Sequence, residues 1–339
     1  MLPNPETELR RDEVEPPPAE PLDAGSDEQQ LRSNAAQLAH KLGWQPSIKS
    51  SRYFIERARA AIKALKPVLG RLHGPAPKAE VSEDFHWLHE NVNLLYTEMQ
   101  SIEKALKPLL KRPHVRTPSG VVVPRIAALA EGFLAASDRQ FSDPAFTAYV
   151  SAFQASTVLK IQELWGLVPA LKLVLLEQIA VRGARVLEDK QGQYGAGACV
   201  RSLRDIGQTS WKDLLEPLIV VDRVLREDPA GAYPRMDFDS RDLYRTKLAK
   251  IAEHSDFSEM EVAHEALALA RAAQQLTDSN PRVTLRRSHV GYYLVSEGVD
   301  LLQQRVAFRA PLLQRMQSYL RKHPDEFYLP AMVALTFVI

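Results

Sequence analysis

The sequence has a single cysteine and almost no net charge, and each shortage excludes a class of protein. Cys199 is the only cysteine among 339 residues, which excludes a disulfide framework and thiolate-rich zinc or iron–sulfur sites and fits a reducing compartment. Forty-three Lys and Arg residues against 42 Asp and Glu residues give a net charge of +1, which argues against a dedicated nucleic-acid-binding protein. The phosphate-loop patterns GxxxxGK(S/T) and GxGxxG and the hydrolase pattern GxSxG are also missing.

The residues that are present favour a folded protein. Hydrophobic residues make up 45% of the sequence and charged residues 25%, so most of the chain can bury a core. At roughly 150 residues per domain, the length leaves room for two or three domains.

Charge is unevenly distributed along the chain. Residues 1–30 hold nine acidic and two basic side chains, about −7 in total, whereas the remainder is about +8. The same segment contains six prolines and few large apolar residues, so it cannot bury enough surface to offset the entropy lost on ordering. We expect a disordered acidic tail over residues 1–48; an acidic arm folded back on a basic surface is the alternative.

Hydrophobic residues recur every three or four positions from about residue 50 onward, as in amphipathic helices. Ser82 is a good N-cap, and Ser258 and Glu261 have capping-box spacing. Only His289–Val295, rich in β-branched and aromatic residues, is typical of a strand. The sequence therefore predicts an all-α protein, a multi-helix bundle of antiparallel amphipathic helices. Helices are expected over residues 52–72, 82–109, 125–136, 143–155, 158–187, 211–226, 239–254 and 258–276.

Two helical regions are expected, a bundle over residues 49–190 and a second region over residues 198–324. The connector between them contains Gly192, Gly195 and Gly197. We interpret it as a connector rather than a phosphate loop, because the preceding element is predicted to be a helix and not a strand. The apolar segment 158–181 is interrupted by four charged residues, which favours a buried core helix over a membrane span.

The C-terminal thirteen residues, 327–339, carry no charge. As a helix they would extend about 20 Å, less than the ~30 Å of a bilayer core. The preceding segment is basic, which is typical of the cytoplasmic flank of a membrane span. These residues predict the start of a transmembrane helix; a C-terminal helix buried in a soluble core is the alternative. The basic residues of the flank are Arg305, Arg309, Arg315, Arg321 and Lys322.

Asp237 and Asp239 have the D-x-D spacing by which many sugar-nucleotide transferases hold a divalent metal. In those enzymes the motif follows a buried strand, but here it follows Pro234 and precedes a predicted helix. We therefore favour Asp239 as a helix N-cap, with Asp242 in the first turn.

The remaining chemical candidates are weaker. His86, His89 and Glu90 share part of a predicted helix but lack a third metal ligand and the HExxH pattern. Cys199 has no fixed basic activator in the sequence. The charged residues between Asp222 and Asp228 are expected to pair with one another around a helix end. The residues thus assign no catalytic, cofactor-binding or metal-binding side chain, and they indicate no small-molecule substrate.

Several segments together resemble the N-terminal region of the cyclic β-1,2-glucan synthase family. The similarity covers about residues 50–339, and its most specific part runs from Val224 to Arg245. The segments, in chain order, are Asp84–Asn91, Pro124–Ala130, Glu163–Gln178, Val224–Phe238, Arg241–Arg245 and His289–Leu294. The stretch between Leu187 and Arg201 is shorter than in the family, and Asp239 lies outside the family pattern.

The resemblance implies a cytoplasmic helical region followed, in the family, by a membrane-embedded glycosyltransferase that uses UDP-glucose and a divalent metal, and then by a glycoside-phosphorylase-like module. Neither catalytic module corresponds to residues of this chain, so no catalytic residue is carried over. The resemblance predicts a truncated, non-catalytic part that supports or positions the transferase, with that module or the inner-membrane surface as its partner. A free-standing soluble helical scaffold and an enzyme acting through Asp237 and Asp239 are the competing hypotheses.

Overall fold

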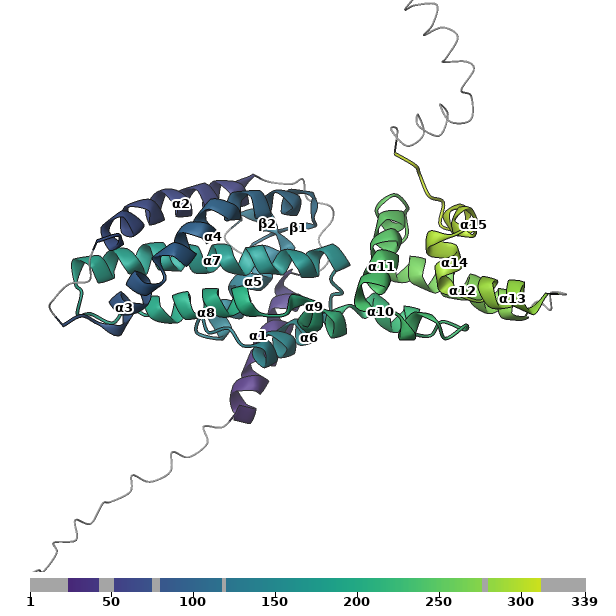
Figure 1. Cartoon of the computed structure of the whole chain (residues 1–339), viewed down its shortest axis with the longest axis horizontal. Helices are drawn as coiled ribbons and strands as arrows, with labels where there is room; N and C mark the ends of the chain where they lie inside the picture. Colours follow the sequence, from purple (N-terminus) through teal and green to yellow (C-terminus); the bar gives the residue numbers. More distant parts are fainter. Residues whose placement is uncertain (1–23, 43–51, 75–79, 118–119, 276–279, 312–339) are drawn as a thin grey trace, which may run out of the picture.

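The computed structural model describes residues 24–42, 52–74, 80–117, 120–275 and 280–311. Within these ranges the chain forms fifteen α-helices, with short 3-10 turns at Lys107–Lys111, Glu216–Leu218 and Tyr233–Arg235 (Figure 1). The helices are α1 (Ala24–Leu42), α2 (Tyr53–Leu72), α3 (Glu83–Glu90), α4 (Val92–Leu106), α5 (Arg125–Ala136), α6 (Asp143–Gln154), α7 (Ile161–Glu188), α8 (Ala196–Gln208), α9 (Trp211–Leu215), α10 (Val220–Leu225), α11 (Phe238–Glu253), α12 (Glu259–Gln275), α13 (Pro281–Arg287), α14 (Val290–Val295) and α15 (Val299–Arg305).

The predicted all-α class is confirmed for the described residues. Their extended structure is limited to one antiparallel hairpin, β1 (His114–Arg116) and β2 (Val122–Pro124), in which Val115 pairs with Val123. The strand expected at His289–Val295 is wrong, because this segment is helix α14. Val290, Tyr293 and Leu294 are buried at helical spacing, so tertiary packing overrides the local preference of β-branched and aromatic residues for strands.

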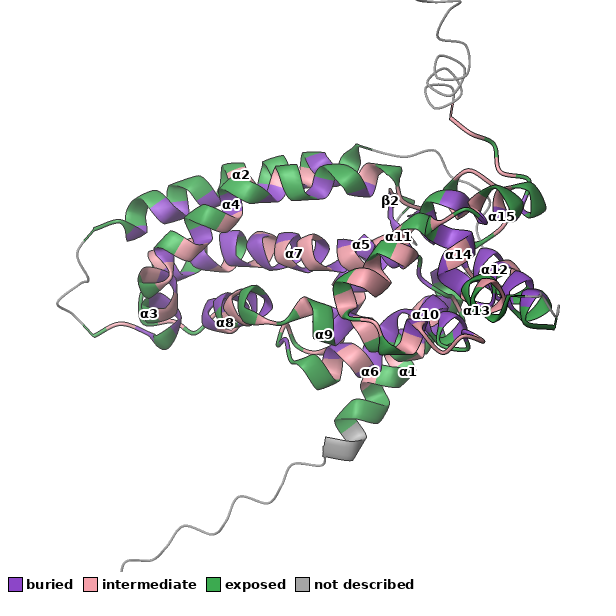
Figure 2. Ribbon diagram, turned by 45° about the vertical axis from the view of Figure 1, so that its right-hand side comes forward, coloured by how far each residue is buried: buried purple, intermediate pink, exposed green. Residues whose placement is uncertain are grey.

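The first group of helices is built around α7, which packs against α2, α4, α5 and α8. Its buried residues are spread around the whole helix, as expected of an element enclosed by neighbours (Figure 2). By length and composition α7 is the one helix among the described residues that could cross a membrane. In its most apolar window, 61% of the residues are buried inside the structure, as expected of a core helix.

Charged residues within α7 are neutralised by neighbouring elements. Glu163 is completely buried and accepts hydrogen bonds from Arg125, whose Nη2 lies 2.5 Å from Glu163 Oε2. Glu98 on α4 lies 2.6 Å from Lys172, and Arg57 on α2 pairs with Glu177 at 2.5 Å. A buried charge without a partner is costly, so these pairs explain how charges fit an apolar core helix.

The second group contains helices α10 to α15. Helix α12 lies at its centre and contacts α10, α11, α13, α14 and α15. Helix α8 packs on α3 and α7, so it belongs to the first group although residues 198–324 were expected to form one region. The change of packing partners comes after α8 rather than at the glycine-containing connector, and Figure 1 shows the two groups side by side.

The expected disorder of residues 1–48 is wrong for residues 24–42, which form α1. This helix packs against α5 and α6 and buries Ala35, Ala39 and Leu42. Small apolar residues give a weak sequence signal, and their burial depends on partners more than 80 residues away in the chain. Residues 1–23 and the apolar run 327–339 lie outside the described residues.

Two helices expected to be continuous are broken. The helix expected over 82–109 ends at Glu90 and resumes at Val92, with Asn91 donating its side-chain amide to the carbonyl of Trp87. The helix expected over 211–226 is interrupted by a 3-10 turn containing Pro217, because proline supplies no backbone donor. The Ser82 cap and the capping box of Ser258 and Glu261 are both present.

Candidate functional site

The D-x-D pair does not converge on a common point. Asp237, not Asp239, is the N-cap of α11: its Oδ1 accepts the Ser240 amide at 2.7 Å and its Oδ2 accepts the Ser240 hydroxyl at 3.1 Å. These hydrogen bonds lower the pKa of Asp237. Asp239 is exposed and pairs with Lys212 at 2.7 Å. Within the described ranges, no group of three or more His, Cys, Asp or Glu side chains is arranged to hold a metal ion.

The histidines of α3 do not converge either. His86 is exposed, whereas His89 stacks on Phe85 and donates from Nε2 to the Gly74 carbonyl at 3.0 Å. The important side chain of this helix is Asp84, which the sequence did not single out. Buried Asp84 accepts the backbone amides of Tyr194, at 2.5 Å, and Gly197, at 2.7 Å.

Asp84 thereby occupies the N-terminus of α8, the place at which a phosphate loop would hold its anion. Gly197 permits this contact, because a Cβ there would lie 2.9 Å from Trp87 Cδ1 and 3.1 Å from Asp84 Oδ1. Gly195 has a φ of +72°, which favours glycine. The glycine-containing segment is therefore a connector, as expected. Nearby Cys199 is buried, and its burial raises the pKa of the thiol.

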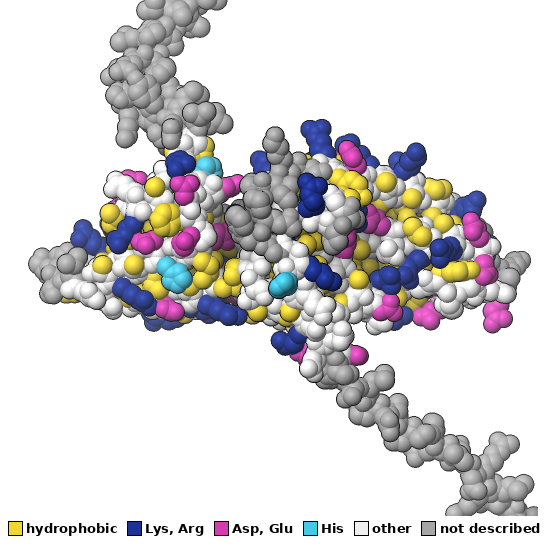
Figure 3. Space-filling view, turned by 180° about the vertical axis from the view of Figure 1, so that it is seen from behind, with side chains coloured by type: hydrophobic (Ala, Val, Ile, Leu, Met, Phe, Trp, Pro, Cys, Tyr) yellow, Lys and Arg dark blue, Asp and Glu magenta, His cyan; other side chains and the backbone are white. Residues whose placement is uncertain are grey.

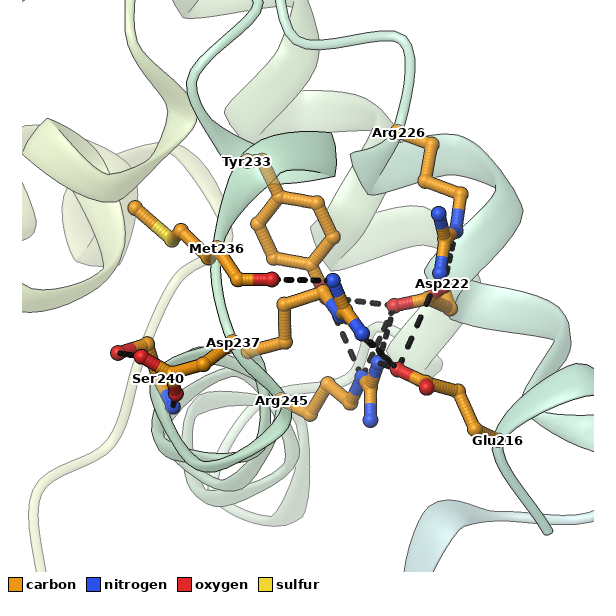
Figure 4. A network of polar contacts seen from close by, with 9 residues as sticks. Glu216, Asp222, Arg226, Tyr233, Met236, Asp237, Ser240 and Arg245 are labelled. Carbon is orange, nitrogen blue, oxygen red and sulfur yellow. Dashed lines mark hydrogen bonds and ion pairs between the residues drawn. The ribbon is translucent and has the colours of Figure 1, made fainter. Parts of the chain in front are cut away.

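The most developed polar cluster is centred on Arg245 of α11, whose side chain is completely buried (Figure 4). Its Nη2 lies 2.6 Å from Asp222 Oδ1 and 2.6 Å from Glu216 Oε1, and its Nε donates to Asp222 at 2.9 Å. The Phe238 ring lies 5.4 Å from the guanidinium carbon. One buried cation thus joins α11 to the start of α10 and to the preceding 3-10 turn.

Further side chains complete the shell around the two carboxylates. Tyr233 donates its hydroxyl to Asp222 Oδ1 at 2.7 Å, Arg226 contacts Asp222 Oδ2 at 2.5 Å, and Arg241 contacts Glu216 at 2.8 Å. Burial acts to raise the pKa of Asp222, but the Tyr233 hydrogen bond and the positive charge of Arg245 outweigh it and lower the pKa. This group of residues, Glu216, Asp222, Arg226, Tyr233, Arg241 and Arg245, is called the Arg245 network below.

A second cluster is centred on Asp228, directly after α10. Its Oδ2 accepts the amides of Ala232 and Tyr233, at 2.9 and 3.1 Å, and the Nδ1 proton of His289 at 2.8 Å. Its Oδ1 accepts the amide of Val290 at 2.9 Å, which caps α14. Burial acts to raise the pKa of Asp228, but these hydrogen bonds, led by the one from His289, lower it.

The second cluster ends at a tyrosine. Because Nδ1 of His289 donates to Asp228, its Nε2 is free to accept the Tyr244 hydroxyl, which lies 3.3 Å away. A Cβ at Gly291 would come within 2.5 Å of both Tyr244 and His289, so this glycine allows the backbone to approach the pair closely. The hydrogen bond from Asp228 fixes the orientation of the His289 imidazole. Together with the contact to Tyr244, it links the loop after α10 to α14 and α11.

The expected pairing around residues 222–228 is confirmed in part. Asp222 and Arg226 pair at helical spacing, as predicted. Glu227 instead pairs with Arg271 on α12 at 2.6 Å, and Asp228 pairs with His289. Sequence reasoning missed Glu216, Tyr233, Arg245 and His289, although all but Glu216 fall within segments that carry the family resemblance.

A cavity of about 580 Å³ lies where the two groups of helices meet. Its lining includes His114 of β1, Arg125, and Glu259 at the start of α12. Glu259 accepts the Ile161 amide at 3.0 Å and so caps α7, while its burial raises the pKa of the carboxyl. His114 Nδ1 contacts the Arg112 carbonyl at 2.7 Å, and its Nε2 has no hydrogen-bond partner in the part of the chain that the structure describes.

Comparison with known proteins identifies a distant relative. No family model matches the chain. The cyclic β-(1,2)-glucan synthase NdvB of Rhizobium meliloti is 24% identical to it over 328 residues, a match that covers 72% of this chain. The chain is therefore related to a region of a glucan synthase.

The chain corresponds to only a small part of this relative, since the match covers 11% of the glucan synthase. The resemblance noted from the segments around Asp84, Glu163 and Val224–Arg245 is thus supported by an independent comparison. The segment with the most specific resemblance, Val224–Arg245, holds most of the side chains of the Arg245 network and also Asp228.

Proposed function

We propose that this chain is a non-catalytic helical region of a cyclic β-1,2-glucan synthase-like protein. In this proposal it supports or positions a membrane-embedded glycosyltransferase that uses UDP-glucose. It acts at the cytoplasmic face of the bacterial inner membrane, and its partner is the transferase module or the membrane surface itself.

The Arg245 network is the observation that carries this proposal. A catalytic carboxylate needs a free oxygen directed toward a substrate. The oxygens of Asp222 and the Oε1 of Glu216 are engaged by arginines and a tyrosine of the same chain. The residues that most resemble the glucan synthase family are thus used to join helices, which supports an architectural role.

The geometry of the D-x-D pair also supports this proposal over an enzyme acting through these two residues. Asp237 is engaged in capping α11 and Asp239 pairs with Lys212. For both carboxylates to bind one metal ion, at least one of these contacts would have to break. Turnover that is lost on Asp237→Ala would favour the enzyme hypothesis instead.

A chimera tests the proposal. The region of the Rhizobium meliloti synthase that aligns with this chain is deleted, or is replaced by this chain, and cyclic glucan made from UDP-glucose is measured in membranes. We expect the deletion to abolish the product and the replacement to restore it. A replacement carrying Arg245→Met should fail, whereas the matched replacement carrying Arg271→Met, at the exposed ion pair with Glu227, should succeed.

Full synthesis by the deleted protein would contradict a supporting role. Glucan synthesis by the purified chain alone would contradict a non-catalytic one. Membrane content of the Arg245→Met chimera, measured by immunoblot, separates loss of folding from loss of support.

A free-standing soluble scaffold is the second candidate, and the burial of α7 favours it. The helix with the most membrane-like composition is enclosed by protein, so the described residues do not require a bilayer. Membrane fractionation of the full chain beside a version ending at Pro324 separates the two candidates. Equal solubility of both versions would favour the scaffold, whereas membrane recovery of the full chain alone would favour the first proposal.

A further inference from the structure

Helices α2 and α4, together with the 3-10 turn Lys107–Lys111 that follows α4, present a cluster of basic side chains on their outer surface. The two helices pack together, and the Arg59–Glu103 ion pair at 2.7 Å links them across the surface. The cluster, called the basic face below, consists of Arg59, Lys63, Lys66, Lys104, Lys107 and Lys111, all of which are exposed.

The helical repeat places these residues on the solvent side. Arg59, Lys63 and Lys66 follow one another at spacings of four and three residues and therefore line one side of α2. The opposite side of the helix buries Leu65, Val68 and other apolar residues against α4 and α7. The basic side chains are thus held outward by the same packing that builds the core.

Two carboxylates of α2 and α4 lie beside the basic face: Glu103, and the exposed Glu56, which is three residues before Arg59. In the ranges that the structure describes, none of its five lysines has a carboxylate within ion-pair distance, and Glu103 is engaged by Arg59. Like charges gathered on one surface repel one another. This repulsion is relieved when a negatively charged surface is placed against them, so the arrangement favours an anionic partner.

The basic face lies on the same edge of the molecule as the last described helix. Helix α2 lies along the upper edge in Figures 1 and 2, and α15, near the end of the described chain, reaches the same edge. Figure 3, seen from behind, shows Lys and Arg side chains along this edge, with acidic and hydrophobic side chains among them. Beyond Pro311 the sequence continues with Arg315, Arg321 and Lys322 and then the apolar run 327–339.

The first described helix, α1, lies on the lower side in both ribbon views. It follows the acidic residues 1–23 in the sequence and has Asp27 in its first turn. In the sequence, the acidic residues thus precede the helix on the lower side, whereas the basic residues and the apolar run follow α15.

We infer that the basic face docks on an anionic lipid surface, with the axis of α2 lying along the membrane. Clusters of four to eight Lys and Arg residues on amphipathic helices bind acidic lipids. Lysine-rich chemistry suits a fluid layer of lipid phosphates, because an ammonium group requires no fixed bidentate geometry. The choice of an acidic lipid surface over other polyanions rests on the proposed function.

Co-sedimentation of the full chain with vesicles tests the inference. One vesicle is an equimolar mixture of phosphatidylglycerol and phosphatidylcholine, and the other is phosphatidylcholine alone. The test variant carries Lys63→Gln, Lys66→Gln and Lys107→Gln. The matched control carries Arg32→Gln, Lys41→Gln and Arg223→Gln, which removes three exposed positive charges from α1 and α10.

We expect the unmodified chain to bind the anionic vesicles more strongly, and high salt to weaken this difference. Each lysine at an anionic surface contributes about fivefold, so the test variant should lose about 100-fold in partitioning to these vesicles. The control variant should lose less than about 10-fold in partitioning to the same vesicles. Residual binding of all variants to phosphatidylcholine reports the apolar run 327–339 and should be equal.

Equal losses in the test and control variants would overturn the inference, because net charge and not this face would then govern binding. Heparin binding at the same strength as vesicle binding, with the same loss in the test variant, would also overturn it in favour of a general polyanion site. Circular dichroism confirms that both variants are folded. The vesicles contain no transferase, so a chain that does not bind them contradicts lipid docking but does not test the proposed function. A chimera that makes no glucan contradicts the proposed function but does not test lipid docking.

Discussion

The two groups of helices are held together by different kinds of interaction. Around α7 the contacts are mainly apolar, and the Lys172–Glu98 pair lies toward the boundary of the core, although Glu163 is completely buried in its pair with Arg125. In the second group, a completely buried arginine joins α11 to α10, and Asp228 joins the loop after α10 to α14. The difference teaches that a helical protein can use polar side chains where its helices are too short to bury much apolar surface.

Helix length is one reason for this difference. Helix α7 has 28 residues, whereas α10 and α14 have six each. An isolated helix of six residues is unstable in water, so short helices depend on caps and on contacts with the rest of the fold. Buried networks meet this need, and they also fix one arrangement, because an unpaired buried charge is expensive.

Loss of Arg245 should have the largest effect on the free energy of unfolding. Arg245→Met leaves two carboxylates without their buried cation and should lower the free energy of unfolding by about 3–5 kcal/mol. The matched change Arg59→Met removes an exposed partner of Glu103 and should cost less than about 1 kcal/mol. Urea unfolding followed by circular dichroism measures both. Similar losses would show that the Arg245 network does not hold the second group.

Truncation of an apolar side chain should have the corresponding effect in the first group. Leu171 on α7 is completely buried, and Leu171→Ala should cost about 2–5 kcal/mol through lost burial and a cavity. Val181 on the same helix is 57% exposed, so Val181→Ala should change the free energy by less than about 0.5 kcal/mol. The same unfolding measurement applies, and a large effect at Val181 would mean that this exposed side is covered by a partner.

A substitution in the Asp228 cluster tests the polar contacts of the second group, with a smaller expected effect on stability. Asp228→Asn removes the negative charge and turns an acceptor oxygen into a donor that faces backbone amides, which should cost about 1–3 kcal/mol. Asp239→Asn, at an exposed position, is the control and should be nearly neutral. Amide exchange at Val290 should accelerate in the first variant, and unchanged protection there would argue against the cap on α14.

The pH dependence of stability should differ in direction between the Asp222 and Asp228 carboxyls and Glu259, which caps α7 from the start of α12. The lowered pKa values of Asp222 and Asp228 mean that their contribution is present above the ordinary carboxyl pKa of 3.8 and is lost as the pH falls through their folded values. The raised pKa of Glu259 acts oppositely: its contribution is present at acidic pH and is lost as the pH rises through the folded value. Melting temperatures between neutral pH and pH 3 should therefore fall less in Asp228→Asn than in the unmodified chain.

Two glycines of α8 give the smallest and sharpest contrast. Gly197→Ala brings a Cβ against Trp87 and Asp84 and should cost about 1–3 kcal/mol by overpacking. Gly207→Ala has nothing within 4 Å of the added Cβ and should stabilise the helix by about 0.5–1 kcal/mol. Opposite shifts in melting temperature are expected, and shifts of the same sign would mean that α8 does not pack on α3 as described.

Periodicity predicted much of the fold because the main helices bury apolar stripes. Helix α2 begins within one residue of the expected position, and the capping box of Ser258 and Glu261 marks the start of α12. The hairpin and α1 were missed, because strands of three residues and stripes of alanine give little local signal. Their stability comes from neighbours that only the folded chain provides.

The polar clusters could be predicted only in part, for a similar reason. The i,i+4 pair of Asp222 and Arg226 follows from helix geometry, but Arg245 lies 23 residues from Asp222 and His289 lies 61 residues from Asp228. No spacing rule connects residues so far apart. Their occurrence within segments that resemble glucan synthases was the available signal, and it pointed to the right residues without indicating their contacts.

The most direct measurement of the central claim is synthesis by the purified chain. It is incubated with radiolabelled UDP-glucose and magnesium, and label in β-1,2-linked glucan is counted beside a reaction without protein. An architectural region should give no more label than the reaction without protein. Label incorporated above that level, and abolished by Asp237→Ala, would contradict the claim that this chain supports a transferase rather than being one.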